Sequence, residues 1–324
     1  MSTSTVSSVL AGNSGRRRIS DDTCSKVQIA AQELGYTPSL LHRNMRRGRT
    51  HVISLFNAFR KRSSGDLYLD RLSGALERAG GVLGYDILIH ANFNRDAQET
   101  YDFLNGGLAD GLVLFGSTAD EPLLPLLRGS SLPTVLVAPH HVEPEFSTVV
   151  DDEAVGMRLI AEALVEHGHR NIAAVVGQRG GMLDPTGRLR RLREELAQRD
   201  VVFDERNIIV YDDSPQDTVR ALLAIKPRPT ALFVWHDGNA YRIVEECEAQ
   251  GIRVPQDLSV VGYDGIVWPC KSPHVVASVA VPLEAMAASG LTLLNRLIEG
   301  EPGPLFDTIP VKFSPGTTLG RPNS

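Results

Sequence analysis

The sequence predicts an α/β protein with two parallel-sheet subdomains, preceded by a small all-α segment. From His51 onward, short apolar runs alternate with amphipathic segments, which is the pattern of parallel strands covered by helices on both faces. Before His51 only short helical patterns occur, separated by glycine and proline. A chain of 324 residues has room for about two domains, each with its own core.

The first residues of the chain are strongly basic. Residues 1–62 hold eleven lysines and arginines against three acidic residues, a charge of +8, whereas the whole chain carries −6. A basic head on an acidic body suits phosphate binding, because the charge of the body discourages nonspecific contacts. A solvated basic tail is the alternative that charge alone leaves open.

Three helical segments are expected in this head. Residues 2–10 carry an apolar stripe at helical spacing. The second segment begins at Ser20, which can act as an N-cap before two acidic residues, and ends at Gly35. The third, residues 38–47, is amphipathic and basic, and Gly48 closes it.

The body shows strand and helix patterns in regular alternation. This order predicts two mononucleotide-type (Rossmann-like) parallel sheets, joined near residues 148–151, with a ligand cleft at the carboxyl ends of their strands. Strands are expected at 52–56, 85–90, 111–115, 134–138, 172–176, 208–211, 231–234 and 258–262, and helices at 67–79, 97–105, 122–127, 155–166, 187–199, 217–225 and 240–250.

Several ordered motifs make the chain similar to a known family. In the head they are Thr5-Val6-Ser7-x-Val9-Leu10, Ile19-Ser20-x-x-Thr23, Ala30-Ala31-x-x-Leu34-Gly35-Tyr36-x-Pro38 and Arg46-x-Gly48-Arg49-Thr50. In the body they include Asp110-Gly111-Leu112, Gly168-His169-Arg170-x-Ile172 and Val260-Val261-Gly262-Tyr263-Asp264. The chain resembles the lactose/galactose repressor (LacI/GalR) family, and its body also resembles the related periplasmic sugar-binding proteins.

The resemblance implies an effector-responsive, DNA-binding transcription repressor. Residues 2–10 would be the recognition helix of a helix-turn-helix, with Thr3, Ser4 and Ser8 facing base edges. Residues 38–47 would be a hinge helix on DNA, in which Met45 replaces the usual leucine wedge in the minor groove. Arg43 and Arg46 of this segment complete the predicted DNA-binding residues.

The family pattern also implies that the headpiece is incomplete at its start. The first helix of the helix-turn-helix is expected before Ser2, whereas the chain begins at Met1. The hypothesis is that the true start lies upstream, because the valine common at the position of Met1 has a codon that also serves as an alternative start. Ser8 stands where the family commonly has arginine, so base preference does not carry over.

Six effector-binding residues follow from the resemblance. Arg188 can hold a hydroxyl pair or a carboxylate in a fork, although a surface helix arginine is the alternative. Asp264, at a strand end, can accept from sugar hydroxyls or cap a helix. Tyr68 can stack on a ligand or belong to the core. The remaining three are His236, where the family often has asparagine, and Asp184 and Trp268, which lie on loops.

The resemblance also implies a division of the chain into four segments. Residues 1–37 form the partial helix-turn-helix headpiece, and residues 38–50 form the hinge helix and linker. Residues 51–149 with about 281–305 form the N-terminal effector subdomain. Residues 150–280 with about 306–324 form the C-terminal one. A homodimer, a DNA operator and a small effector, expected to be a sugar, are the implied partners.

Other classes of protein fit the sequence less well. No catalytic or nucleotide-binding motif is present, and Asp151-Asp152 and Asp212-Asp213 are expected to be solvated loop ends, so no enzyme, cofactor or metal is expected. Scattered cysteines and the lack of an apolar leader or membrane-spanning run indicate the cytoplasm. A periplasmic-type binding protein is the rival class. The other alternative is that this chain is a sugar-binding protein of the same fold that does not itself bind DNA, because its headpiece is truncated.

Overall fold

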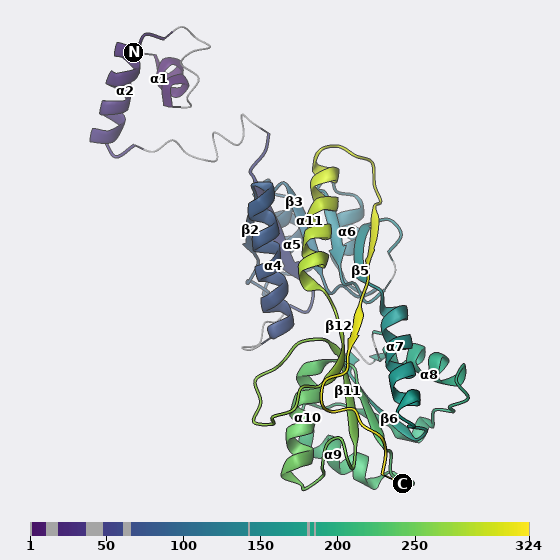
Figure 1. The fold of residues 1–324 in the computed structure, drawn as a ribbon. Helices are drawn as coiled ribbons and strands as arrows, with labels where there is room; N and C mark the ends of the chain where they lie inside the picture. Colours follow the sequence, from purple (N-terminus) through teal and green to yellow (C-terminus); the bar gives the residue numbers. More distant parts are fainter. Residues whose placement is uncertain are drawn as a thin grey trace.

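The computed structural model describes residues 2–10, 19–36, 48–60, 66–141, 143–179, 182–184 and 186–323. The predicted hinge helix, with Arg43, Met45 and Arg46, lies outside the described residues. The body consists of two α/β units, drawn one above the other in Figure 1. Each unit is a parallel or mostly parallel sheet between helices, as the strand and helix alternation predicts.

Two helices of the headpiece pack against each other. They are α1 (Thr3–Leu10) and α2 (Asp21–Glu33). The Ser20 side chain caps α2 by accepting a hydrogen bond from an amide of the first turn. Val9 and Val27 are the buried apolar residues of these helices. Both helical predictions, and the N-cap at Ser20, are confirmed.

The first unit contains a six-stranded sheet in the order β13-β5-β4-β3-β1-β2, and all of its strand pairs are parallel. Its central strands are buried along their whole length, because helices cover both faces. The strands are β1 (Val52–Asn57), β2 (Asp86–Ile89), β3 (Gly111–Phe115), β4 (Thr134–Val137), β5 (Ser147–Asp151) and β13 (Phe306–Ile309), and the helices are α4 (Leu67–Leu83), α5 (Ala97–Leu104), α6 (Leu124–Arg128) and α11 (Leu283–Ile298).

The second unit contains a six-stranded sheet in the order β14-β12-β11-β10-β6-β9, parallel except for the β12–β14 pair. Its strands are β6 (Ile172–Val176), β9 (Ile208–Val210), β10 (Ala231–Val234), β11 (Ser259–Asp264), β12 (Ala277–Ala280) and β14 (Lys312–Ser314). Its helices are α7 (Glu153–Glu166), α8 (Arg188–Ala197), α9 (Pro215–Ala224), α10 (Asp237–Ala249) and the 3-10 helix η2 (Glu205–Asn207), with a short hairpin of β7 (Gln178–Arg179) and β8 (Met182–Leu183).

Three segments connect the two units, after β5, after β12 and after β13. The Asp152 amide donates to the Ile309 carbonyl at 2.9 Å, so two of these crossings are bonded to each other. The predicted return to the second unit near residue 306 is wrong. Residues 306–309 pair with β5 in the first sheet, and the chain crosses only between Ile309 and Lys312. Ile309 is buried there, which ties this strand to the first core.

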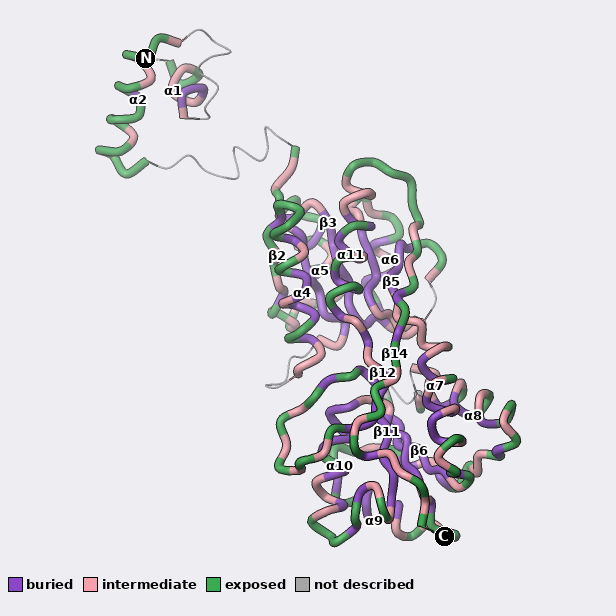
Figure 2. The backbone as a smooth tube through the Cα atoms, viewed as in Figure 1, coloured by how far each residue is buried: buried purple, intermediate pink, exposed green. Residues whose placement is uncertain are grey.

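Each sheet buries apolar side chains on both faces, and its central strands are coloured as buried in Figure 2. Alternation along β1 shows how one strand serves two layers: Ile53 and Leu55 belong to the core beside α4, whereas Phe56 packs with Leu112 and Leu114 on the other face. This packing fixes the carboxyl ends of the strands and therefore the loops that follow them.

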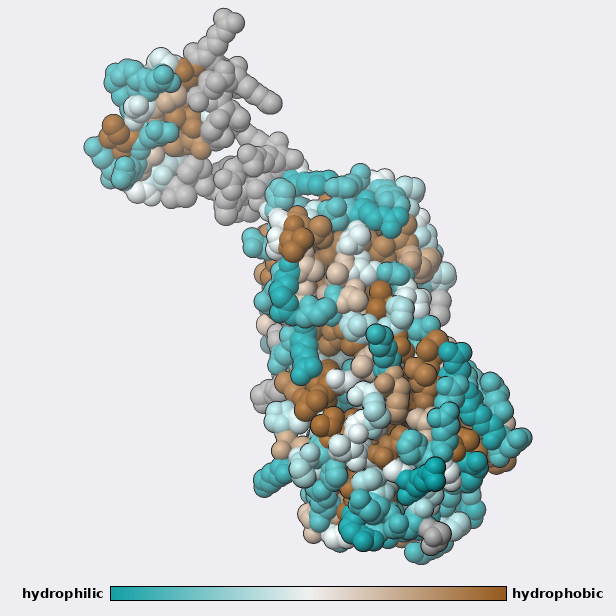
Figure 3. Space-filling model, viewed as in Figure 1, coloured by the Kyte–Doolittle hydropathy of each residue, from teal (hydrophilic) through white to brown (hydrophobic). Residues whose placement is uncertain are grey.

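Some large apolar side chains remain on the surface of the body. On α4 and the adjacent β2 they include Val82, which is 87% exposed, together with Leu83 and Leu88. Val267 and Val275 are exposed in the second unit. Figure 3 shows apolar patches on the face that carries α4. Among the described helices, none is both long and apolar enough to cross a bilayer.

Candidate ligand site at the junction of the two units

The carboxyl ends of strands from both sheets meet where the two units join. Polar and aromatic side chains gather there from each unit. We call the following set the junction site: Tyr68 from α4, Asp151 from β5, Glu153 from α7, Arg188 from α8, and Tyr263 and Asp264 from β11.

Arg188 lies at the centre of this set. Its Nε donates to Glu153 Oε1 at 2.9 Å, and its Nη1 donates to the carbonyl of Trp235. Asp264 Oδ1 lies 3.7 Å from Nη1, and the guanidinium lies 3.7 Å from the centroid of the Tyr263 ring. Nη2 has no hydrogen-bond partner in the described part of the chain. The side chain is only 12% exposed, so Nη2 is a preorganised donor.

Buried charges at the junction site shift one another's pKa. Burial alone would lower the pKa of Arg188, but the carboxylates of Glu153 and Asp264 raise it above its ordinary value. Burial raises the pKa of Glu153 and, more strongly, that of Asp264, although Arg188 opposes both shifts. Burial and the charge of Asp151 also raise the pKa of Tyr68, which places this phenol of the first unit among the same charges.

Tyr263 links the end of β5 to β11. Its hydroxyl donates to Asp151 Oδ2 at 2.6 Å. Gly156 of α7 makes room for the ring, since a Cβ there would lie 2.7 Å from the hydroxyl. The expectation that Asp151-Asp152 is a solvated loop end is wrong, because Asp151 accepts this bond and Asp152 caps α7 by accepting from the Val155 amide at 3.0 Å.

Four aromatic side chains follow the edge of the second sheet, and we call them the aromatic arc: Tyr211, Trp235, His236 and Trp268. The Tyr211 and Trp235 rings are 5.4 Å apart, and the Trp235 and His236 rings are 4.7 Å apart. Gly238 admits the Trp268 indole, because a Cβ there would lie 2.9 Å from it. The Tyr211 hydroxyl and the Trp268 Nε1 are buried and have no partner among the described residues. Buried polar atoms of this kind are costly unless a ligand or water satisfies them.

Asp237 fixes the loop that carries Trp268. Its Oδ1 accepts from the Ser278 hydroxyl and its Oδ2 from the Ile266 amide, both at 2.7 Å. A Cβ at position 262 would lie 2.1 Å from Oδ1, so glycine is required there. Burial raises the pKa of Asp237 to about 7, against the opposing effect of the Ser278 hydrogen bond.

Only some of the predicted effector residues lie at the junction site. Arg188, Asp264 and Tyr68 come together at the junction site, and the Tyr68 ring stacks on Phe115 with 5.7 Å between centroids. Trp268 lies in the aromatic arc. His236 is the N-cap of α10, accepting from the Asn239 amide at 3.4 Å. Burial, with the charge of Arg188, lowers the pKa of His236 to about 3, so its ring is neutral.

Two predicted residues make hydrogen bonds within their own part of the chain. Asp184 Oδ2 accepts from the amides of Leu189 and Arg190 at 3.0 and 3.4 Å, so its carboxylate caps α8. Ser8 was expected to face a base edge. It is buried instead, and its hydroxyl donates back to the Ser4 carbonyl at 2.8 Å. Thr3 and Ser4 are exposed on α1, as the prediction requires.

Sequence reasoning missed Glu153, Tyr263 and the arc residues Tyr211 and Trp235. Tyr263 stands one residue before Asp264 at the end of an apolar strand, which is a usable signal for a site residue. Glu153 follows the first crossing between the units, and only the tertiary fold brings it to Arg188.

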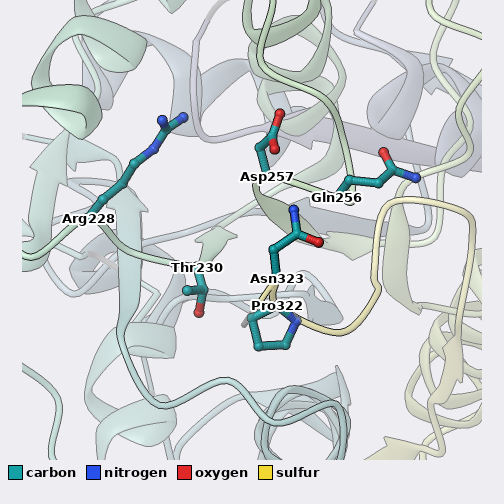
Figure 4. A pocket seen from close by; sticks show the side chains of 6 residues that line it. All are labelled: Arg228, Thr230, Gln256, Asp257, Pro322 and Asn323. Carbon is teal, nitrogen blue, oxygen red and sulfur yellow. The ribbon is translucent and has the colours of Figure 1, made fainter.

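Two hollows in the described part of the chain lie away from the junction site. One, of about 180 Å³, is lined by Arg228, Thr230, Gln256, Asp257, Pro322 and Asn323 (Figure 4). Thr230 and Asp257 precede their strands, so this hollow is at the opposite edge of the second sheet from the junction site. The other, of about 220 Å³, includes Thr134 and Leu297 in the first unit. Among the described residues, no group of His, Cys, Asp or Glu is arranged to hold a metal ion.

A pair of α/β units that gathers charged and aromatic side chains at its junction defines the class of two-unit small-molecule-binding proteins. In agreement, residues 161–318 match the periplasmic binding protein-like domain. The HTH-type transcriptional repressor PurR of Erwinia tasmaniensis is 30% identical over 310 residues, covering 92% of this chain and 86% of the relative. PurR of Yersinia enterocolitica is 29% identical over 316 residues, covering 94% and 89%. The chain belongs to the LacI family of DNA-binding transcriptional repressors.

Solved structures of transcriptional regulators have the same fold. A lac repressor dimer bound to operator and an anti-inducer superposes with a TM-score of 0.81, at 20% identity, over 99% of this chain and 96% of that one. The complex of the transcriptional regulator CelR with cellobiose gives a TM-score of 0.71 at 26% identity, over 98% and 96%. These relatives are regulators of transcription.

Proposed function

We propose that this repressor responds to a small sugar or polyol bound at the junction site. The observation that carries the proposal is the grouping of Arg188, Asp264 and Tyr68 at the facing edges of the two sheets. Carboxylate oxygens accept hydrogen bonds from sugar hydroxyls, and a guanidinium donates to them. Aromatic faces such as those of the arc suit the apolar face of a sugar ring. The CelR relative, which binds cellobiose, supports the same ligand class.

We further propose that ligand binding is passed to DNA through the hinge. The chain leaves the headpiece through residues 38–50 and enters the first unit at β1. A sugar that favours one arrangement of the two units would shift operator affinity by its differential affinity for the two states. The proposed target is a DNA operator, and the proposed place of action is the cytoplasm. Thr3 and Ser4 are the proposed base-facing residues of α1.

The functional unit proposed is a homodimer formed through the body. Exposed apolar side chains on α4 and β2, including Val82 and Leu88, support this surface. The lac repressor relative is a dimer on its operator. Two headpieces held together can read two half-sites.

A thermal-shift screen tests the effector class. The chain is heated with neutral mono- and disaccharides, including cellobiose, and in parallel with purine bases and amino acids. A sugar that binds the folded state raises the midpoint of unfolding. A shift with purines or amino acids, and with no sugar, would contradict the sugar assignment.

A further inference from the structure

The charge balance around Arg188 bears on which ligands the junction site accepts. Glu153 Oε1 accepts a hydrogen bond from Arg188 Nε, and Arg191 Nε lies 3.3 Å from Glu153 Oε2. Five described carboxyl groups outnumber these two arginines. Each either affects the pKa of Arg188 or has its own pKa affected by Arg188: Asp151, Glu153, Asp184, Asp237 and Asp264. Burial raises the pKa of both Asp237 and Asp264, and with both protonated the three remaining carboxylates still outnumber the two arginines.

The remaining cations near the site are already paired. Arg242 of α10 donates to Asp213 Oδ1 at 2.8 Å. Arg60, which follows β1, donates to the buried Glu121 at 2.8 Å. His236 is neutral. Neither Arg242 nor Arg60 therefore offers an unpaired positive charge to the junction site.

We propose that Glu153 and Asp264 make the junction site selective for uncharged ligands and exclude phosphate esters and carboxylic acids. This inference rests on the proposed function, and it changes the expected role of Arg188. With carboxylates on both sides, the guanidinium offers its Nη2 donors to neutral hydroxyl or carbonyl oxygens. An anion would have to approach a surplus of negative charge, and the juxtaposition of like charges disfavours its binding.

The test uses tryptophan emission, because Trp235 and Trp268 are the two tryptophans of the chain and both lie in the aromatic arc. The full chain is titrated with matched pairs: glucose and glucose 6-phosphate, cellobiose and cellobionate, adenosine and AMP. The neutral member of a pair that binds should do so at least about tenfold more tightly than its anionic partner. An anionic member that binds as tightly as its neutral partner would overturn the proposal.

The pairs also separate this inference from the proposed function. Binding of adenosine in preference to AMP, with no response to any sugar, would contradict the sugar assignment and leave the charge selectivity intact. Binding of glucose 6-phosphate in preference to glucose would do the reverse.

A second titration does not depend on the identity of the effector. Sodium sulfate is added at constant ionic strength to the full chain and to Glu153→Gln, which removes one carboxylate from Arg188. Sulfate, followed by the change in tryptophan emission, should bind Glu153→Gln more tightly than the unaltered chain, because the variant carries one negative charge fewer beside Arg188. Glu162→Gln, which alters another α7 glutamate paired with Arg199, is the matched control and should behave like the unaltered chain. Sulfate binding by the unaltered chain that is equal to, or tighter than, that by a folded Glu153→Gln would refute the proposal.

Discussion

At the scale of single residues, Asp237 is the buried acid whose titration has a direct consequence for stability. Its folded pKa is about 7, against an ordinary value of 3.8. The folded chain therefore binds a proton more tightly than the unfolded chain between these values. Stability contributed by that proton is present at the acidic end and is lost as the pH rises toward about 7.

Asp237→Asn should flatten this dependence. An asparagine can keep the hydrogen bond from the Ile266 amide with its oxygen and donate its amide to the Ser278 hydroxyl, without a titrating group. The unfolding free energy from urea denaturation, measured at several values between about pH 4 and pH 7, should fall less steeply in the variant. Equal slopes in the two proteins would show that Asp237 does not titrate in this window.

At the scale of elements, two glycines in helices make opposite predictions. Alanine is the better helix former by about 0.5–1 kcal/mol. At Gly81 of α4 an added Cβ would have no neighbour within 4 Å, so Gly81→Ala should stabilise the chain. Gly156→Ala would place a Cβ 2.7 Å from the Tyr263 hydroxyl, and it should destabilise by about 1–3 kcal/mol. Thermal unfolding of both variants checks the signs, and a stabilising Gly156→Ala would show that Tyr263 can move aside freely.

The entry of the chain into β1 is held by one carboxylate. Asp110 Oδ1 accepts from the Thr50 amide and hydroxyl at 2.6 and 2.8 Å, and its Oδ2 accepts from the His51 amide at 2.9 Å. Arg49 donates to the Ile298 carbonyl at the end of α11 at 3.3 Å. The other end of α11 follows the crossing beside Asp264, where Val281 donates to the Asp264 carbonyl at 3.0 Å. One helix thus connects the junction site to the chain that leads to the headpiece.

Asp110→Ala should weaken DNA binding by about tenfold or more, because it releases three hydrogen bonds that order the residues next to the hinge. The measurement is fluorescence anisotropy with a duplex that the unaltered chain selects from a random library. Asp86→Ala, an exposed acid at the start of β2, is the control and should bind normally. Unchanged DNA affinity in Asp110→Ala would mean that this anchor does not support the hinge.

The elements that could be predicted are those whose pattern lies within a short stretch of sequence, whereas elements placed by contacts between distant residues could not. Strands β3 and β6 are continuous apolar runs and are visible in the sequence alone. β13 has only four residues and an exposed Phe306, and its place in the first sheet is set by pairing with β5 far away in the chain. The site divides in the same way. Asp264 is marked by its strand end, whereas the Glu153–Arg188 pair exists only because α7 and α8 pack together.

At the scale of the whole molecule, the proposed homodimer can be broken at one surface. Val82→Glu places a charge on the exposed apolar surface of α4 and should convert the dimer to a monomer in light scattering coupled to size-exclusion chromatography. Val202→Glu alters a valine that is 89% exposed, comparable to the 87% of Val82, but lies in the second unit, and it should leave the dimer intact. A dimeric Val82→Glu would assign the interface to another face.

The most direct test of the whole account is the DNA affinity of the chain with and without a sugar that raises its unfolding midpoint. Anisotropy of the selected duplex should change by about fivefold or more on adding the sugar, in either direction. The change should vanish in Arg188→Ala, while DNA binding without sugar persists. A sugar that binds the chain but leaves its DNA affinity unchanged would contradict the conclusion that this repressor is controlled from the junction site.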